Sequence, residues 1–365
     1  MPPLEAWEKV YISNEEFVSS VHNAANCIGC HGGVGGTDDK DVAHEGVVVD
    51  PTTDPAPACG TCHGEIVQNA ETSLHFAING YSTVLEARGA DFDNPAMAEA
   101  FGNHCTECHT TCGQCHVSRP SYAGGGLTKG HEFKKVASIT LTCLGCHGGR
   151  VGPEYQGKNE GIKGDIHWSK GGMPCLTCHD VTQYHGDGTE YAHRYDGAVA
   201  PNCVDCHADV EGGADGVMQH MLHGEKVACQ VCHSAGEYKS CYGCHVGKDD
   251  AGLPFRQTEP TQFDFKIGLN PQLSDERPWE YVLLRHVPVA RGTFDYYGEN
   301  LLPDFDAVPT WKYTTPHNIQ RITPQNQDCN NCHGNADLFL TAEDVLPDEE
   351  QANSSVVVGE VPAAR

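Results

Sequence analysis

Every cysteine of this 365-residue chain belongs to one pattern, Cys-x-x-Cys-His. Two thiols three positions apart, with an imidazole directly after the second, form the attachment pattern for c-type haem. Each thiol can form a thioether with one haem vinyl group, and the histidine then lies under the ring and ligates the iron. The ten copies are Cys27/Cys30/His31, Cys59/Cys62/His63, Cys105/Cys108/His109, Cys112/Cys115/His116, Cys143/Cys146/His147, Cys175/Cys178/His179, Cys203/Cys206/His207, Cys229/Cys232/His233, Cys241/Cys244/His245 and Cys329/Cys332/His333.

Other chemistry also uses paired cysteines. Cys-x-x-Cys pairs build Cys₄ zinc sites, disulfides in secreted chains and iron–sulfur sites. None of these requires a histidine after the second cysteine, and iron–sulfur ligation would leave that histidine without a role. Because all 20 cysteines fall in such motifs, the sequence predicts ten covalently bound c-type haems.

The second axial ligands must come from outside the motifs. Ten irons need ten further ligands if all are six-coordinate, and the chain offers twelve other histidines but only five methionines. These numbers favour bis-histidine haems, which have lower reduction potentials than haems ligated by methionine. His104 is the expected spare because it directly precedes Cys105. The distal candidates are His22, His44, His75, His131, His167, His185, His193, His220, His223, His286 and His317, and the surplus among His185, His193, His220 and His223 stays open.

A histidine precedes two motifs by five or six residues, at His22 and at His223. Before the first of these, Ser13-x-x-Glu16 has the form of a capping box and predicts a short helix that runs to His22. We expect such a histidine to ligate a neighbouring haem rather than the next one in sequence. That arrangement would lock successive haems together.

Composition and charge narrow the function classes. The chain has 50 acidic and 23 basic residues, a net charge of −27, which disfavours binding to nucleic acid. No stretch approaches 18 apolar residues, so no transmembrane helix is expected. Hydrophobic residues make up only 39%, so we expect haems to fill the core. The predicted fold is mostly irregular and α-helical with few short strands, a multihaem cytochrome c fold wrapped around a chain of stacked haems.

The spacing of the motifs suggests the organisation of the chain. Residues 1–245 form a nine-haem region, 246–328 a haem-free aromatic-rich segment, 329–345 the tenth haem and 346–365 a polar tail, all within one continuous haem-cored unit. Short helices are expected to carry the motifs. The seven-residue step from Cys105 to Cys112 and the twelve-residue step from Cys229 to Cys241 predict closely spaced haems.

The segment 246–328 has two interpretations. It either wraps haem faces and delivers His286 and His317 as ligands, or forms a lobe that binds a partner or substrate. Within it, Tyr281–Val289 is predicted to be extended. The polar tail is expected to be disordered, with a strand that docks on a neighbour as the alternative.

Haem chemistry also suggests a location. Covalent haem is attached after the chain crosses the membrane, so we expect an extracytoplasmic protein, in the periplasm, at the cell surface or outside the cell. The chain begins without an apolar signal segment, and we expect such a segment to have been removed. The acidic loop Gly186–Glu190 could bind calcium, but its fit to a calcium loop is poor and a solvated loop is favoured.

The chain resembles the multihaem, decahaem-type c-type cytochromes of anaerobic respiring bacteria and archaea. Beyond the motifs, the resemblance is carried by Cys105–Pro120, Cys143–Val151, Gly164–Cys178, Cys229–Val246 and Tyr313–Gln320. It implies bis-histidine haems in a stacked chain. It also implies electron transfer between redox partners, such as other cytochromes and respiratory enzymes, and a distant or extracellular acceptor, for instance a metal oxide or a partner cell.

Two alternatives follow from the same resemblance. Some relatives assemble into extracellular filaments, in which a histidine of one subunit ligates a haem of the next. Others are reductases: the nitrite reductases carry Cys-x-x-Cys-Lys, whereas every motif here ends in histidine. The hydroxylamine-oxidoreductase-like and tetrathionate-reducing members are similar only in the repeated motif, and their active haem needs a five-coordinate iron or an unusual ligand. An electron carrier is therefore favoured over an enzyme.

Overall fold

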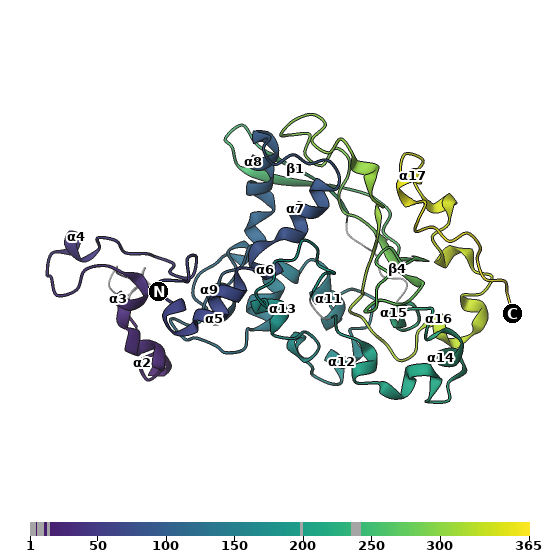
Figure 1. The fold of residues 1–365 in the computed structure, drawn as a ribbon, viewed down its shortest axis with the longest axis horizontal. Helices are drawn as coiled ribbons and strands as arrows, with labels where there is room; N and C mark the ends of the chain where they lie inside the picture. The colour runs from purple at the N-terminus through teal and green to yellow at the C-terminus, as the bar shows by residue number, and fades with distance from the viewer. Residues whose placement is uncertain (1–4, 6–10, 13–14, 198–199, 235–241) are drawn as a thin grey trace. The chain divides into compact units, whose positions relative to one another are not determined.

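The computed structural model describes residues 5, 11–12, 15–197, 200–234 and 242–365. Figure 1 shows short helices joined by long loops, with strands confined to the green part of the chain. Segments far apart in sequence gather into two compact units. Unit 1 contains Met1–Ile78, Glu107–His147 and Val181–Tyr191, and unit 2 contains Asn79–Thr106, Gly148–Asp180 and Ala192–Arg365. This division differs from the expected boundary at residue 245, because it follows contacts in space rather than the spacing of motifs.

Unit 1 is built from short helical turns. Its α-helices are α2 (Glu15–Val18), α3 (Asn26–His31), α4 (Lys40–Ala43), α5 (Gly60–Ala70), α6 (Leu74–Ala77), α9 (Cys112–His116), α10 (Leu144–His147) and α13 (Thr182–His185). It also contains the 3₁₀ turns η1 (Val21–Ala25) and η3 (Ser121–Ala123) and the π-helical turn η4 (Ile139–Cys143); the 3₁₀ turn η2 (Thr106–Cys108) spans the boundary between the units. The helix expected before His22 occurs as α2 and η1, while Ser13 of the expected capping box lies outside the described residues.

Little apolar side chain is buried in unit 1. Its described buried hydrophobic residues are Val67, Ala70, Ile78 and Val117, whereas Val21 and Val49 are 84% and 89% exposed. Polar close contacts replace apolar packing in places: Thr52 and Thr111 hydrogen-bond through their hydroxyls at 2.8 Å. A Cβ on Gly113 would lie 2.5 Å from the Thr52 hydroxyl, so only glycine fits there. The polypeptide alone therefore gives unit 1 a sparse core.

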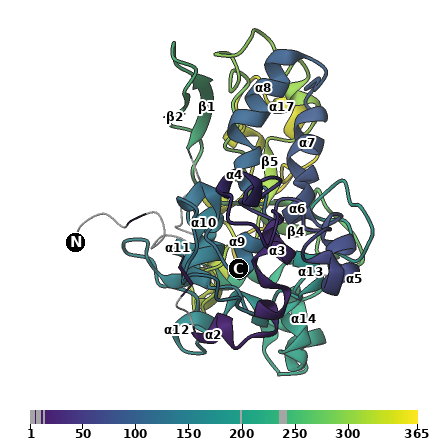
Figure 2. The ribbon, with the colours of Figure 1, turned by 90° about the vertical axis from the view of Figure 1, so that its left-hand side faces the viewer.

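Unit 2 contains the strands. They are β1 (Gly243–Lys248), β2 (Pro254–Glu259), β3 (Lys266–Leu269), β4 (Tyr281–His286) and β5 (Trp311–Tyr313). β1 and β2 form an antiparallel hairpin, seen in Figure 2, and β3, β4 and β5 form an antiparallel sheet in that order. The expectation of an extended segment at 281–289 is met by β4 over Tyr281–His286.

Unit 2 also contains short helical segments. They are α7 (Asn79–Glu86), α8 (Pro95–His104), α11 (Val151–Gln156), α12 (Ile166–Ser169), α14 (Met218–His223), α15 (Cys229–His233), α16 (Pro324–Gln327) and α17 (Glu350–Asn353), with 3₁₀ turns η5 (Cys175–Thr177), η6 (Cys203–Asp205), η7 (Ala208–Gly213), η8 (Phe305–Ala307), η9 (Cys329–Asn331), η10 (Ala336–Leu338) and η11 (Ala342–Asp344). None of the described helices is both long and apolar enough to cross a bilayer.

The three-stranded sheet carries an apolar core. Val282 and Leu284 on β4 and Trp311 on β5 are almost fully buried and pack with Leu340 and Val356. A second cluster joins α7 and α8 to β1 and to the segment that contains Phe294 and Phe305. Unit 2 thus buries aliphatic and aromatic side chains as an ordinary globular unit does.

The C-terminal tail packs on this sheet, which corrects the expectation of disorder. The Leu269 amide donates to the Val356 carbonyl at 2.9 Å, and the Val358 amide donates to the Leu340 carbonyl at 2.8 Å. A Cβ on Gly268 would lie 2.7 Å from the Val356 carbonyl oxygen, so a glycine on β3 permits this approach. The expectation of disorder rests on the polarity of the tail sequence, whereas Val356 and Val358 of the tail are buried in the core beside the sheet.

We expect acid to loosen this packing through Glu349. Burial raises the pKa of Glu349, but hydrogen bonds from His286 and Thr310 and the positive charges of His286 and Arg88 outweigh it and lower the pKa below 4.5. A lowered folded-state pKa adds stability above the unfolded pKa, and this stability is lost as pH falls through the folded value. Glu349→Gln should cost about 1–3 kcal/mol at pH 7 and flatten the acid dependence. Hydrogen exchange of the Val356 and Val358 amides, followed from pH 7 to 3, measures this stability. An equal acid dependence in the wild type and in Glu349→Gln would contradict the prediction.

Candidate haem-binding sites

The attachment motifs lie on or directly beside helical turns, with one exception. α3, α9 and α15 each contain a whole motif, and η5, η6 and η9 begin at the first cysteine of one. One turn brings residues three apart to the same face, so both thiols can reach one ring edge. The exception is the ninth motif: Cys244 and His245 lie on β1, whereas the sequence predicts a helix, and Cys241 lies outside the described residues.

The attachment thiols differ in their exposure. Cys62 and Cys206, the second cysteines of their motifs, are exposed, whereas their partners Cys59 and Cys203 are half-buried. Both exposed thiols lie where a helical turn ends: α5 is kinked at His63, directly after Cys62, and Cys206 is the C-cap of η6. The other exposed thiols are Cys27, Cys178 and Cys329.

Eight motif histidines each face a histidine from outside the motifs. The separations are between ring centroids. In unit 1 they are His22–His63 at 6.5 Å, His31–His131 at 6.0 Å, His75–His147 at 6.3 Å and His116–His185 at 6.1 Å. In unit 2 they are His167–His207 at 6.1 Å, His179–His317 at 6.3 Å, His220–His233 at 6.1 Å and His223–His333 at 6.1 Å.

This separation is the one that an iron between two imidazoles requires. Metal–imidazole bonds are about 2 Å long, so two trans imidazoles have centroids about 6 Å apart once both ring radii are added. Two rings in direct stacking contact would lie closer, as His22 and Phe133 do at 4.3 Å. The eight pairs therefore fit bis-histidine haem, with one ligand of each pair supplied by a motif.

The ring nitrogens are oriented for the same role. In four motif histidines Nδ1–H donates to a backbone carbonyl and Nε2 remains for a metal: His31 to Val48 (2.8 Å), His116 to Lys134 (2.6 Å), His233 to Gln320 (3.0 Å) and His333 to Ala363 (3.1 Å). Such a partner fixes the tautomer and the ring plane of a ligating histidine. No sequence signal marks these carbonyls, because each comes from a residue 17 to 87 positions away.

Burial keeps several distal candidates neutral. It lowers the pKa of His22, assisted by the charges of His63 and His116, and it lowers the pKa of His131 and His185. A neutral imidazole has the free lone pair that a metal needs, so these rings can bind iron at neutral pH without first losing a proton.

The pairing crosses between motifs. His22 lies just before the first motif but faces His63 of the second, and the first motif's His31 faces His131. On α14, His220 faces His233 while His223, one turn later, faces His333. One short helix therefore supplies a histidine to each of two pairs, whose motifs begin 100 residues apart, at Cys229 and Cys329.

Thiols of different motifs also meet. Cys59 hydrogen-bonds Cys112 in unit 1, and Cys203 hydrogen-bonds Cys229 in unit 2; this contact raises the pKa of Cys59 and Cys203 and lowers the pKa of Cys112 and Cys229 to about 7. The second motif thus neighbours the fourth, and the seventh neighbours the eighth.

Two motif histidines have no facing histidine within their own unit, among the residues described. His109 has its pKa lowered by burial and packs edge-on against Phe76 at 4.7 Å. His245 donates from Nδ1 to the Gly292 carbonyl, but its Nε2 contacts a Glu259 carboxylate oxygen at 3.1 Å. Glu259 would have to move before an iron could bind there, so the ninth motif does not fit as found.

The remaining histidines outside the motifs have other surroundings. Buried His286, expected to be a distal ligand, bonds Thr261 through Nδ1 and Glu349 through Nε2, so neither nitrogen points to a motif. His104, the expected spare, is buried and bonds the Tyr297 hydroxyl. His193 accepts the Tyr195 amide at Nδ1, and exposed His44 bonds the Lys40 carbonyl through Nδ1.

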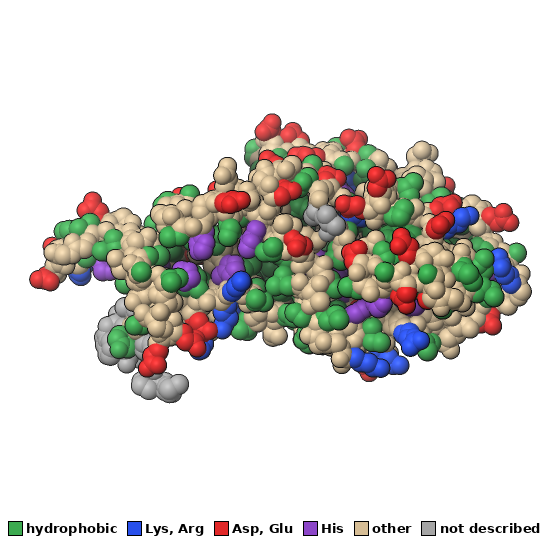
Figure 3. Space-filling model, turned by 60° about the horizontal axis from the view of Figure 1, so that its bottom comes forward, with side chains coloured by type: hydrophobic (Ala, Val, Ile, Leu, Met, Phe, Trp, Pro, Cys, Tyr) green, Lys and Arg blue, Asp and Glu red, His purple; other side chains and the backbone are tan. Residues whose placement is uncertain are grey.

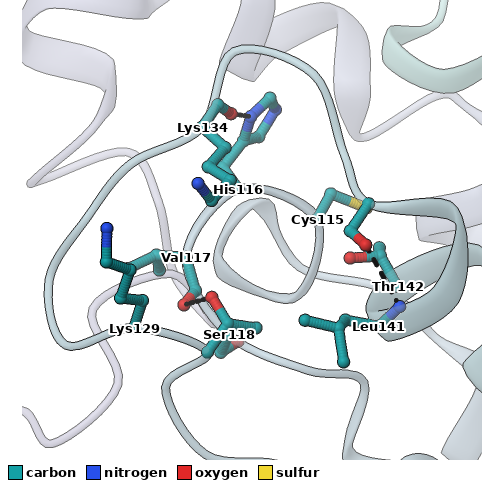
Figure 4. A pocket seen from close by; sticks show the side chains of 10 residues that line it. Cys115, His116, Val117, Ser118, Lys129, Lys134, Leu141 and Thr142 are labelled. Atoms are coloured by element: carbon teal, nitrogen blue, oxygen red, sulfur yellow. Dashed lines mark hydrogen bonds between the residues drawn. The ribbon is translucent and has the colours of Figure 1, made fainter.

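Some histidine side chains lie in hollows of the surface. Figure 3 shows histidine side chains gathered in hollows of the face drawn, next to hydrophobic side chains. One pocket of unit 1, in Figure 4, lies between Cys115 and His116 of the fourth motif and the residues Leu141 and Thr142 on η4. Across the described part of the chain, no group of three or more His, Cys, Asp or Glu side chains could hold a metal ion. Two-histidine sites suit a metal whose other ligands belong to a porphyrin.

The pairs predict a specific spin-state change. His220→Ala should leave the haem at Cys229–His233 without its second imidazole and convert that one haem from low-spin to high-spin. His286→Ala is the matched control, because it removes a buried histidine of the same unit without touching a pair. Electron paramagnetic resonance and the near-infrared spectrum distinguish the two states. A new high-spin signal in His286→Ala, or none in His220→Ala, would contradict the pairing.

Comparisons with protein-family models, with curated proteins and with solved structures return no match. The spacing of the motifs and the geometry of the histidine pairs are therefore the grounds on which function is argued. Both concern the same residues: each of the eight pairs joins one motif histidine to one histidine outside the motifs.

Proposed function

We propose that the chain is a decahaem-type c-type cytochrome that transfers electrons along closely spaced haems. The observation that carries the proposal is the agreement of two independent patterns. Ten attachment motifs appear in the sequence, and eight of their histidines face a second histidine at 6.0–6.5 Å. Helix packing alone does not explain why a motif histidine occurs in each of these pairs.

The residues divide the work between attachment and ligation. The cysteines would hold the haems through thioethers, and each pair of imidazoles would ligate one iron. When bound, each haem supplies a reversible one-electron couple. At the eight paired sites both ligands would come from the protein, so none of these eight would be open for a substrate, which favours a carrier over an enzyme.

Location and partners belong to the same proposal. Covalent haem attachment implies an extracytoplasmic site, and the acidic surface suits redox partners that present positive charge. Such partners are other cytochromes or respiratory enzymes on one side and a distant or extracellular acceptor, such as a metal oxide or a partner cell, on the other.

Redox assays separate a carrier from a reductase. The reduced protein should be reoxidised quickly by ferric chelates or an electrode, and turnover of nitrite, hydroxylamine and tetrathionate should be negligible, because paired imidazoles exclude these substrates from eight sites. Any turnover should arise at His109 or His245, which lack a facing histidine among the described residues of their unit. Saturable steady-state turnover of any of these substrates would favour the reductase instead.

A filament subunit is the second candidate, and His44 is the observation that favours it. His44 is exposed on the loop that follows the first motif, and its Nδ1 is fixed by the Lys40 carbonyl at 2.5 Å. The Nε2 atom could therefore reach a neighbouring copy. His22, which lies closer to the chain start, already faces His63 of its own chain.

We expect discrete particles rather than filaments. A net charge of −27, increased by haem propionates, opposes self-association, and the opposition weakens as salt screens it. Electron microscopy of the purified protein at low and physiological salt, with His44→Ala beside the wild type, tests this. Ordered fibres in the wild type that disappear in His44→Ala would replace the discrete carrier with the filament subunit.

A further inference from the structure

Two distal histidines differ from the others in the partner of Nδ1. His167 contacts an Asp165 carboxylate oxygen at 2.8 Å, and His220 contacts an Asp215 carboxylate oxygen at 2.7 Å. By contrast, distal His75 and His223 donate to the backbone carbonyls of Gln183 and Gln219, at 3.3 and 3.2 Å. The motif histidines with described Nδ1 partners also use carbonyls.

Both carboxylates are held in place by other bonds. The Asp165 side chain is 4% exposed and accepts the amides of His167 and Ile319, at 2.8 and 2.9 Å. Asp215 accepts the Val217 amide at 3.0 Å. These hydrogen bonds hold both carboxylates in place, so they are not chance neighbours of the rings.

A fixed carboxylate changes the imidazole as a ligand. A charge-assisted hydrogen bond at Nδ1 is stronger than one to a neutral carbonyl. It draws the proton toward the carboxylate, makes Nε2 a stronger donor to the iron and so stabilises the ferric state. The reduction potential of that haem falls relative to haems whose histidines donate only to carbonyls.

The two affected sites are neighbours. His167 faces His207 of the seventh motif, and His220 faces His233 of the eighth. The thiols Cys203 and Cys229 of these motifs hydrogen-bond each other. Hence the two carboxylate-bonded histidines serve adjacent haems.

We propose that Asp165 and Asp215 are positioning residues that make the haems at Cys203–His207 and Cys229–His233 an adjacent low-potential pair within unit 2. This inference rests on the proposed function and adds an order of haem potentials within unit 2 to it. Electrons entering unit 2 would reside on its other haems and cross this pair only in transit. The pair would thus act as an internal barrier to transfer in either direction.

Charge-neutral variants of the haem-loaded protein test the step. Asp215→Asn keeps the shape of the side chain and removes the charge; Asp165→Asn does the same at the second site. Asp209→Asn is the control, because Asp209 is an exposed carboxylate of unit 2 with no described bond to a histidine. Potentiometric titration followed by optical and electron paramagnetic resonance spectra measures each protein, after a pyridine haemochrome count has established its haem content.

We expect each variant to raise the midpoint potential of one haem by about 59 mV, a tenfold change in its reduced-to-oxidised ratio, and to shift one low-spin ferric signal. The double variant should move two haems. Unchanged midpoints, or a shift no larger than that of Asp209→Asn, would overturn the proposal. If Asp165→Asn fails to fold, Asp215→Asn decides alone. A haem-free wild type would instead refute the proposed function, so the two failures are distinguishable.

Discussion

The approach of two imidazoles to about 6 Å, the separation that ligation of one iron would require, is the constraint on which the rest depends. Each such pair joins a motif to a histidine elsewhere in the chain, so under the proposed function iron ligation would act as a tertiary crosslink. In the pair His22–His63, a histidine that precedes the first motif faces the histidine of the second motif. In the pair His223–His333, the two histidines are far apart in the sequence. Loops that carry few apolar residues can then be held by metal bonds instead of by packing.

The two units depend on this constraint to different degrees. Unit 2 buries Val282, Leu284 and Trp311 in a sheet of its own and closes it with the C-terminal tail. Unit 1 buries few described apolar side chains and leaves Val21 and Val49 exposed. A haem core would cover such side chains, so folding of unit 1 should be inseparable from haem attachment, as for structural metal sites. Unit 2 should keep part of its structure without it.

The sequence reveals the chemistry of the site better than its geometry. The spacing of the motifs predicts haem attachment and the motif ligands, because both are local properties of the sequence. The strand at Tyr281 is likewise predicted from its own local run of residues. The sequence could not assign distal partners, since proximity of His167 to His207 is a property of the fold, nor could it tell that the Cys62 and Cys206 thiols are exposed while others are half-buried. It did not indicate that buried His286 bonds Glu349, and it was wrong about the tail, whose buried Val356 is not revealed by polarity. The aspartates at Nδ1 were invisible because nothing in the sequence marks an outer hydrogen bond.

Intact mass spectrometry of the purified protein, paired with a pyridine haemochrome assay, tests the central claim most directly. Each occupied motif adds the mass of one haem and converts two thiols to thioethers, so the two methods count the same bonds independently. Ten haems per chain are predicted, with free thiols absent. Fewer than nine haems, or a protein whose cysteines remain reactive, would contradict the interpretation of these motifs as haem sites.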